Sequence, residues 1–307
     1  MQADISNVKQ HILVMGAGEL GLAVLRGLAD RSTESASVTV LLRRQTVEQK
    51  RQDVEVIKEL GIDIELADVV EDSVEELATV LSRFDTVISC VGFAAGRGTQ
   101  RKLTEAALMS GVKRYIPWQF GVDYDLIGRG SPQDLFDEQL DVRDLLRAQS
   151  RTEWVIISTG MFTSFLFDSA FGVVDLPAAT VNALGSLETA VTVTTPDDIG
   201  VLTAAIVLHT PRVINQVVYT AGDTLTYGDL ADLLERVTGR KVERQESSVQ
   251  ALQADLEKSP DDNLRKYGAV FAMGHGVAWD VAKTFNGVHG LSVTSAEQWA
   301  RAHLSLS

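Results

Sequence analysis

The chain has 307 residues, of which 45% are hydrophobic, and it carries a formal net charge of −14 from 28 Lys and Arg against 42 Asp and Glu. A chain of this length and apolar content can bury a large core, as one α/β unit or two closely joined domains. The acidic balance argues against nucleic acid as a partner, because a negative surface repels phosphate backbones. Cys90 is the only cysteine, which excludes an intramolecular disulfide.

The sequence shows neither the pattern of a secretory signal nor that of a membrane span. No basic-then-apolar stretch opens it, and no apolar run approaches the roughly 20 residues that a membrane-spanning helix needs. We therefore expect a soluble cytoplasmic protein, monomeric or homodimeric, without a membrane partner.

Short apolar runs alternate with amphipathic segments through the first half of the chain. The run 11–15 ends at Gly16, and segment 19–31 repeats Leu and Val at helical spacing. The further predicted elements are strand 37–42, helix 47–60, strand 62–66, helix 73–83, strand 85–91, helix 97–110, strand 113–117, helix 134–148 and strand 153–158. This alternation predicts an α/β fold with a doubly wound, Rossmann-type parallel sheet over residues 1–158.

The pattern changes after residue 159. Strands are predicted at 190–195 and 215–221, separated by a helix that begins at Pro196. Further helices are predicted at 226–238, 248–257, 261–272 and 294–305. We interpret residues 159–307 as a smaller, mainly helical substrate domain, with segments near 190–222 returning to the Rossmann domain.

Residues 16–21 (GAGELG) fit the pattern G-x-G-x-x-G between a strand and a helix. Gly16 permits a tight turn, Gly18 lets a pyrophosphate approach the backbone, and Gly21 allows close helix packing. The helix N-terminus would then present N–H groups to the phosphates. An ordinary glycine-rich turn is the alternative, but the strand–turn–helix context favours dinucleotide binding. The candidate contacts are Gly16, Gly18, Glu19, Leu20 and Gly21.

The end of the second predicted strand bears on the choice between NAD and NADP. An NAD enzyme usually places Asp or Glu there, whereas this chain has Arg43 and Arg44. A guanidinium can bind a 2′-phosphate that a carboxylate would repel, and Lys50 could add a third positive charge. The alternative is that these side chains only face solvent. We predict NADP(H).

The fourth strand ends in small residues that would let a cofactor ribose lie against the backbone. Val91, Gly92 and Phe93 are the candidates, and a plain strand-to-loop turn is the alternative. Cys90, inside the apolar strand, is predicted to be a buried small hydrophobe rather than a nucleophile.

Familiar catalytic motifs are missing. The sequence contains no Tyr-x-x-x-Lys pair, no G-x-S-x-G elbow and no H-E-x-x-H or cysteine cluster, so we predict no metal. His275, between two glycines, is a candidate substrate-side group.

Segment 115–123 (YIPWQFGVD) makes the chain recognisable. Together with the glycine motif, the strand end at Arg43 and segment 85–89 (DTVIS), it resembles the isoflavone-reductase-like group of the NmrA-type atypical short-chain dehydrogenases. Segments 153–162 (EWVIISTGMF), 195–200 (TPDDIG) and 274–280 also match in order, so the resemblance spans nearly the whole chain. It implies NADPH-dependent reduction of double bonds, benzylic ethers or carbonyls of aromatic compounds. It also implies cofactor contacts from Gln119, Phe120, Thr159 and Gly160.

The resemblance also implies a general acid/base lysine on the helix after the F-G pair. Aligned through Phe136, that position here is Gln139, which can hydrogen-bond a carbonyl oxygen but cannot give up a proton at neutral pH. Protonation would then come from water, Tyr124 or His275. The Ser-Glu of the family motif is likewise replaced, by Trp118 and Gln119.

Several aromatic and apolar side chains follow the sixth strand, in the segment that the resemblance places beside the nicotinamide and the substrate. Met161, Phe162 and Phe165, with His275, are the candidate substrate contacts, and Phe167 and Phe171 extend the segment. Such a wall would suit a flat apolar substrate such as a quinone, enone or phenylpropanoid. Ordinary packing of the segment is the alternative.

Two functions fit these observations. The first is an NADPH-dependent reductase of a small apolar or aromatic substrate, in which orientation supplies most of the rate. The second is a non-catalytic, NADP(H)-binding redox sensor, which the missing lysine and the altered Ser-Glu favour. The aromatic wall favours the enzyme.

Overall fold

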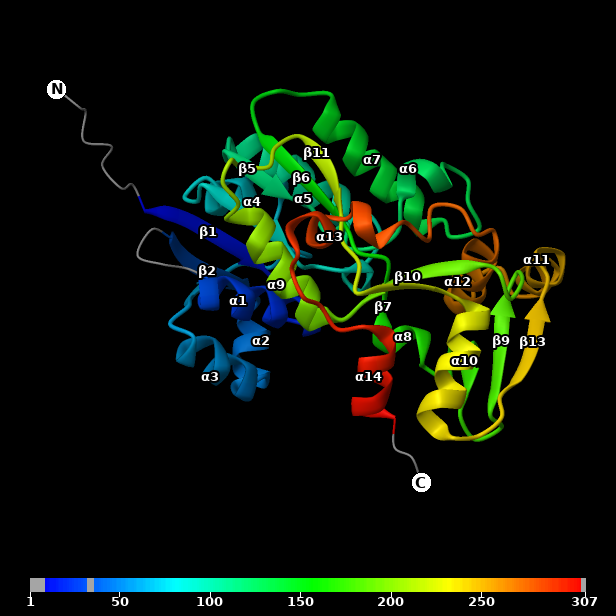
Figure 1. Cartoon of the computed structure of the whole chain (residues 1–307). Coiled ribbons are helices and arrows are strands. Elements are labelled where there is room, and N and C mark those ends of the chain that lie inside the picture. The colour runs from blue at the N-terminus through cyan, green and yellow to red at the C-terminus, as the bar shows by residue number, and fades with distance from the viewer. Residues whose placement is uncertain (1–8, 32–35, 305–307) are drawn as a thin grey trace. The chain divides into compact units, whose positions relative to one another are not determined.

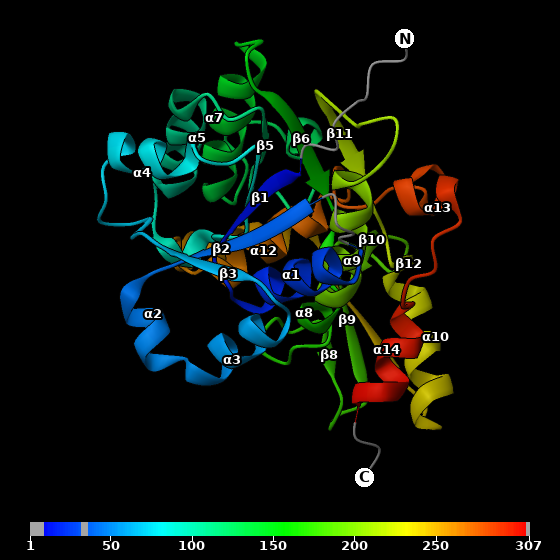
Figure 2. The same cartoon turned by 90° about the vertical axis from the view of Figure 1, so that its left-hand side faces the viewer.

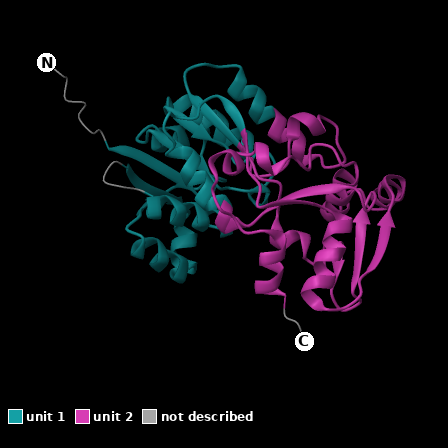
Figure 3. Cartoon of the chain, in the orientation of Figure 1, with its two compact units in different colours: residues 1–118, 141–156, 199–217 teal, residues 119–140, 157–198, 218–307 magenta. Residues whose placement is uncertain are grey.

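The computed structural model describes residues 9–31 and 36–304 (Figure 1). The chain divides into two compact units, each assembled from three stretches of sequence (Figure 3). Unit 1 comprises residues 1–118, 141–156 and 199–217, and unit 2 comprises residues 119–140, 157–198 and 218–307. Segments of the chain after residue 158 therefore also contribute to unit 1. The single domain boundary that the sequence predicted near residue 158 is not found.

The central element is a seven-stranded sheet with the order β11-β6-β5-β4-β1-β2-β3. Its strands are β1 (Gln10–Met15), β2 (Ala36–Leu42), β3 (Asp63–Leu66), β4 (Thr86–Ser89), β5 (Arg114–Ile116), β6 (Glu153–Ser158) and β11 (Gln216–Tyr219). β1 pairs in parallel with both β2 and β4, so that Ile12 lies between Val38 and Thr86. The predicted doubly wound parallel sheet is confirmed, and the reversal of strand order beside β1 places a ligand crevice at the carboxyl ends of β1 and β4.

Helices cover both faces of this sheet within unit 1 (Figures 1 and 2). On one face, Leu13 and Met15 of β1 belong to a buried cluster with residues of α4 (Val74–Leu81), α5 (Thr99–Ser110) and the 141–147 part of α7 (Leu135–Arg147). α1 (Glu19–Arg31) and α9 (Pro196–Val207) pack against each other, with a glycine of each helix at the contact. Because β1 and β6 are buried over most of their length, they contain unbroken apolar runs, whereas the edge strand β3 is largely accessible.

The helix predicted at 47–60 is two helices, α2 (Arg44–Gln49) and α3 (Arg51–Glu59). Lys50 lies between them with φ −106° and ψ 58°, outside the helical region. α3 buries Val54 and Ile57, whereas α2 buries no residue, so no apolar anchor holds α2 in line with α3.

Unit 2 contains two three-stranded sheets, with the orders β12-β10-β7 and β13-β9-β8. The strands are β7 (Met161–Phe162), β8 (Val174–Asp175), β9 (Thr180–Leu184), β10 (Ala190–Thr194), β12 (Asp223–Thr226) and β13 (Glu243–Ser247). The expectation that 190–195 returns to the central sheet is wrong, because both edges of β10 are paired, with β7 and with β12. The expectation for 215–221 is correct, because β11 is the outermost strand of the central sheet.

Four helices of unit 2 follow the predicted segments closely: α10 (Tyr227–Thr238), α11 (Val249–Lys258), α12 (Asn263–Ala272) and α14 (Ala296–His303). Three short helices were not predicted: α6 (Tyr124–Ile127), α8 (Thr163–Leu166) and α13 (Phe285–His289). The predicted last helix extended to residue 305, which lies outside the described residues. Within 9–31 and 36–304, no helix is long and apolar enough to cross a membrane.

Candidate functional site

The 16–21 loop leads from the carboxyl end of β1 into the first turn of α1. Gly16 has φ +89° and donates its N–H to Leu41 O at 3.0 Å, which ties the loop to β2. A Cβ on Gly21 would lie 2.2 Å from Gly16 O, whereas a Cβ on Gly18 would meet nothing within 4 Å. The loop is therefore packed tightly on its inner side and open at Gly18. Glu19 and Leu20 begin α1, with Glu19 exposed and Leu20 buried.

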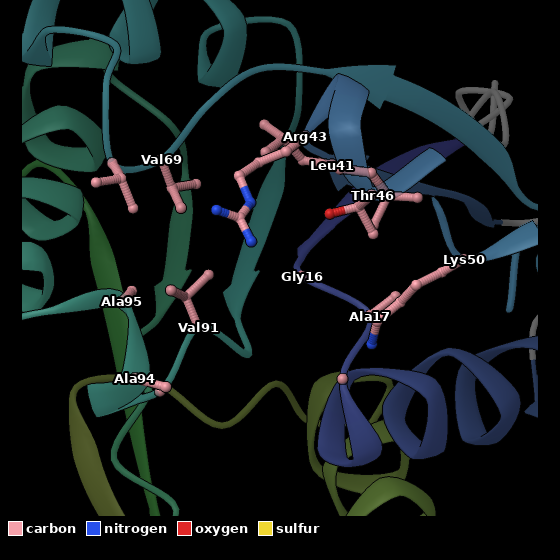
Figure 4. Close-up of a pocket in the computed structure, with 14 residues that line it drawn as sticks. Gly16, Ala17, Leu41, Arg43, Thr46, Lys50, Val69, Val91, Ala94 and Ala95 are labelled. Carbon is pink, nitrogen blue, oxygen red and sulfur yellow. The ribbon is translucent and has the colours of Figure 1, made fainter. Parts of the chain in front are cut away.

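A hollow of about 580 Å³ lies beside this loop in unit 1 (Figure 4). Its lining comes from the ends of β1, β2, β3 and β4 and from α2: Gly16, Ala17, Gly18, Leu41, Leu42, Arg43, Thr46, Lys50, Val69, Val70, Val91, Gly92, Ala94 and Ala95. No Asp or Glu is among these lining residues. The hollow thus combines open glycine backbone, apolar walls and two cationic side chains.

Arg43 and Lys50 supply these two positive charges. Arg43 immediately precedes α2, and Figure 4 shows its guanidinium extending into the hollow, with the Thr46 hydroxyl also turned inward. The Lys50 ammonium lies toward Ala17 in the same view and is 3.7 Å from Asp53 Oδ2. Two cations in the lining of one hollow can hold a phosphate ester.

Arg44 is in a different place from its neighbour. It lines a second hollow, together with Glu48, Asp68 and Asp72. Arg43 precedes α2 in extended conformation (φ −72°, ψ 143°), whereas Arg44 is the first helical residue, so the two side chains leave the backbone in different directions. The structure therefore separates two arginines that the sequence analysis had grouped.

The end of β4 differs in detail from the prediction. Val91 and Gly92 line the hollow, but Phe93 does not, and Ala94 and Ala95 take its place. The Phe93 ring packs edge-on against Trp118, with centroids 4.6 Å apart. Cys90 is 8% exposed, and burial raises the pKa of its thiol, as expected for a small core residue.

Eight lining residues were not among the predicted contacts: Ala17, Leu41, Leu42, Thr46, Val69, Val70, Ala94 and Ala95. Val69 and Val70 follow β3, the neighbour of β2. Once the strand order is known, the residues just after β3 are expected at the same sheet edge, so the order was the missing signal.

The segment after β5 is held by buried hydrogen bonds within unit 2. Gln119, fully buried, donates from Nε2 to Gln139 O at 2.7 Å, and Phe120 is buried beside it in the chain. Gly121 O accepts from the N–H groups of both Thr159 and Gly160, at 2.9 and 3.0 Å. These contacts bring together four residues that the resemblance implied: Gln119, Phe120, Thr159 and Gly160.

The proposed catalytic groups differ widely in exposure. Gln139 is fully buried, and neither of its side-chain amide atoms has a hydrogen-bond partner. Tyr124 is 3% exposed, with its ring edge-on to Phe136 at 4.9 Å. His275 is exposed, and its neighbour Gly276 accepts from Asp123 N at 2.7 Å. Among the three, only His275 is open to solvent.

An aromatic cluster surrounds the segment after β7. Phe165 stacks on Phe171 at 4.4 Å and meets Tyr267 edge-on at 6.0 Å, and Tyr267 also meets Phe136 at 5.9 Å. Phe162 and Phe165 are half-buried, whereas Met161 is buried. Phe167 stacks instead on Trp299 at 5.0 Å, which is the packing role considered in the sequence analysis.

Comparisons with known proteins place the chain in a family. A sequence model of the NmrA-like family matches residues 8–275. An NmrA-like family domain-containing oxidoreductase of Gibberella moniliformis is 44% identical over 300 residues, covering 96% of this chain and 98% of its own.

Two solved structures share the fold. Isoflavone reductase has a TM-score of 0.81 at 21% identity and covers 97% of this chain and 100% of its own. AtPrR2, solved with NADP+ and (+)-pinoresinol, has a TM-score of 0.76 at 20% identity and covers 96% of this chain and 99% of its own. The predicted resemblance is confirmed, and the predicted NADP(H) agrees with the cofactor of this neighbour. The chain belongs to the NmrA-like family.

Proposed function

We propose that the protein is an NADPH-dependent oxidoreductase that reduces a small apolar or aromatic substrate. The observation that carries this proposal is the hollow at the carboxyl ends of β1, β2 and β4, which has Arg43 and Lys50 in its lining and no carboxylate. Its oxidoreductase relative in Gibberella moniliformis supports the same class.

The hollow fits the phosphate-bearing half of NADP(H). The open backbone at Gly18 and the N-terminus of α1 would receive the pyrophosphate, because no side chain blocks the approach there. Arg43 would hold the 2′-phosphate through paired N–H donors, with Lys50 as a second positive charge and Thr46 as a hydroxyl donor. When bound, the cofactor supplies a hydride to the substrate.

Residues of unit 2 would orient the substrate. Phe162 and Phe165 keep part of their surface accessible and offer flat apolar contacts. Gln139 cannot replace a lysine as proton donor, so the product would take its proton from water. This favours substrates whose reduced anions are already stabilised, such as quinones and activated enones.

The cofactor half of the proposal is tested with a matched pair of variants. We expect the wild type to bind NADPH more tightly than NADH. Arg43→Ala should lose about 1.5–3 kcal/mol of NADPH binding, or roughly 10- to 100-fold in Kd, with little effect on NADH. Arg44→Ala is the control, because Arg44 lines the other hollow. Calorimetric titration of both cofactors measures this, and equal wild-type affinities would contradict it.

The catalytic half is tested by turnover. NADPH consumption is followed with a panel of quinones, enones and aromatic aldehydes, and product formation is checked by mass. We expect reduction of at least one class, and a higher KM for NADPH in Arg43→Ala. Tight NADPH binding without consumption across the panel would favour the non-catalytic sensor instead.

A further inference from the structure

The strand β13 (Glu243–Ser247) is the outermost strand of the β13-β9-β8 sheet in unit 2 (Figure 1). It pairs in parallel with β9 along its whole length. Over residues 9–31 and 36–304, no strand pairs with its second edge. The first four of its five residues are exposed and the last is half-buried, so this edge is accessible.

The backbone groups of β13 alternate between its two edges. Glu243 donates its N–H to Ala179 O at 2.8 Å, and at the other end Ser247 O accepts from the residue after β9, also at 2.8 Å. In a parallel ladder alternate residues direct both backbone groups to the same neighbour, so the odd-numbered residues of β13 face β9. The N–H and C=O groups of Arg244 and Glu246 therefore point along the free edge, where a further strand can pair with them.

This free edge lacks the usual protection of edge strands, which commonly carry a proline, a bulge or lysines that repel a second strand. β13 contains no proline, and its register with β9 is continuous over all five residues, so it has no bulge. It carries charges of both signs, from Glu243, Arg244 and Glu246. Such an edge accepts a strand that places opposite charges across from these residues.

β13 is itself such a strand when it runs antiparallel to a second copy. Outward-facing residues must meet outward-facing residues, so a twofold axis passes through one residue position of β13. An axis at 244 places arginine opposite arginine, and an axis at 246 places glutamate opposite glutamate. An axis at Gln245 places Arg244 of each copy opposite Glu246 of the other, and Glu243 opposite Ser247. Only this last register of the three pairs opposite charges and leaves no like charges across from each other.

We propose that the chain forms a homodimer in which β13 pairs antiparallel with β13 of a second copy, about a twofold axis at Gln245. Arg244 and Glu246 of the second copy then exchange both of their backbone hydrogen bonds and pair their charges, twice in the dimer. Arg244 also contacts Asp232 and Glu235 of α10. A guanidinium has five N–H donors, so these contacts leave donors for a further carboxylate.

Charge inversion tests this register directly. Sedimentation velocity should show a dimer for the wild type. Glu246→Arg places arginines opposite each other and Arg244→Glu places glutamates opposite each other, so each variant alone should raise the dimer dissociation constant about tenfold or more. An equal mixture of the two variants restores both opposite-charge pairs. Native mass spectrometry, which separates the two masses, should therefore show mainly the mixed dimer.

Two further variants separate strand pairing from other effects. Glu243→Arg makes the same change of charge on the same strand, but opposite Ser247, so it should keep the wild-type dimer. Glu246→Pro removes a backbone N–H that points away from β9, so it should abolish the dimer without disturbing the β9 ladder. Thermal melts establish that each variant is folded, and Glu246→Pro still decides the question if Arg244→Glu is not.

The proposal is overturned if the wild type is monomeric up to the highest concentration at which it stays soluble. It is also overturned if Glu243→Arg weakens the dimer as much as Glu246→Arg, or if the mixture forms no more dimer than its two components alone. These measurements need no cofactor, and β13 belongs to unit 2 whereas the hollow belongs to unit 1, so their outcome is independent of the proposed function.

Discussion

The three glycines of the 16–21 loop differ in what requires a glycine at each position. Gly16 adopts φ +89°, a conformation that side chains other than glycine rarely accept. Gly21 lies so close to Gly16 O that a Cβ would approach within 2.2 Å. Gly18 has neither constraint, because its φ is not in the left-handed region and its Cβ position is open. Stability therefore explains two of the glycines but not Gly18, which is the position that the proposed pyrophosphate contact requires.

Gly18→Val should abolish NADPH binding while the protein stays folded. The branched side chain would occupy the space where a pyrophosphate meets the backbone, and it would touch nothing in the core. Calorimetry with NADPH and a thermal melt measure the two halves of this prediction. Gly21→Val is the contrast, since it should lower the melting temperature sharply. A Gly18→Val protein that binds NADPH like the wild type would show that this loop does not contact the phosphates.

At the level of elements, burial decides what the sequence could reveal. β6 is buried on both faces, so the apolar run 153–158 predicted it to the residue. β13 (ERQES) is exposed at most positions and carries no apolar alternation, so nothing in the sequence marked it. The split of 47–60 was missed because charged and apolar residues keep helical spacing across Lys50.

The site followed the same rule. Backbone positions fixed by a motif, such as Gly16 and Gly18, were predicted because the strand–turn–helix context determines them. The directions of side chains were harder to predict from the sequence. Arg43 and Arg44 are adjacent in sequence, and only the start of α2 between them sends them to separate hollows.

The contact between α1 and α9 depends on two glycines. A Cβ on Gly200 would lie 2.2 Å from Ala23 O, and one on Gly27 would lie 2.5 Å from Gly200 O. The two backbones therefore approach more closely than any side chain allows.

Gly200→Ala should lower the free energy of unfolding by about 1–3 kcal/mol, because the two helices must move apart. Gly268→Ala on α12 is the matched control, since its Cβ would meet only Leu252 Cδ2, at 4.0 Å. That variant should be stabilised by about 0.5–1 kcal/mol, the usual gain from replacing a helical glycine. Urea denaturation compares both with the wild type. Equal effects of the two substitutions would contradict the close contact.

At the scale of the whole molecule, the net charge of the chain and the charge of the hollow's lining have opposite signs. The chain carries a formal net charge of −14, yet the lining of the hollow holds Arg43 and Lys50 and no carboxylate. An anionic cofactor that binds as we propose would be repelled by the average surface and attracted by this lining. All residues of the hollow belong to unit 1, whereas the implied contacts Gln119, Thr159 and Gly160 belong to unit 2.

Hydrogen exchange should show which part of the cofactor contacts each of these two sets of residues. Adenosine 2′,5′-bisphosphate carries the 2′-phosphate but no nicotinamide, so it should slow amide exchange only in unit 1, at 16–22, 43–50 and 91–95. NADPH should slow the same segments and also 119–121 and 159–161. The Thr159 and Gly160 amides already donate to Gly121 O, so their exchange requires local opening, and a ligand that contacts this segment makes the opening rarer. β13 and α11 serve as the internal control and should exchange equally in all three samples. Equal protection of 159–161 by the bisphosphate and by NADPH would mean that this segment does not contact the nicotinamide half. Absence of protection at 16–22 would remove the cofactor from the hollow altogether.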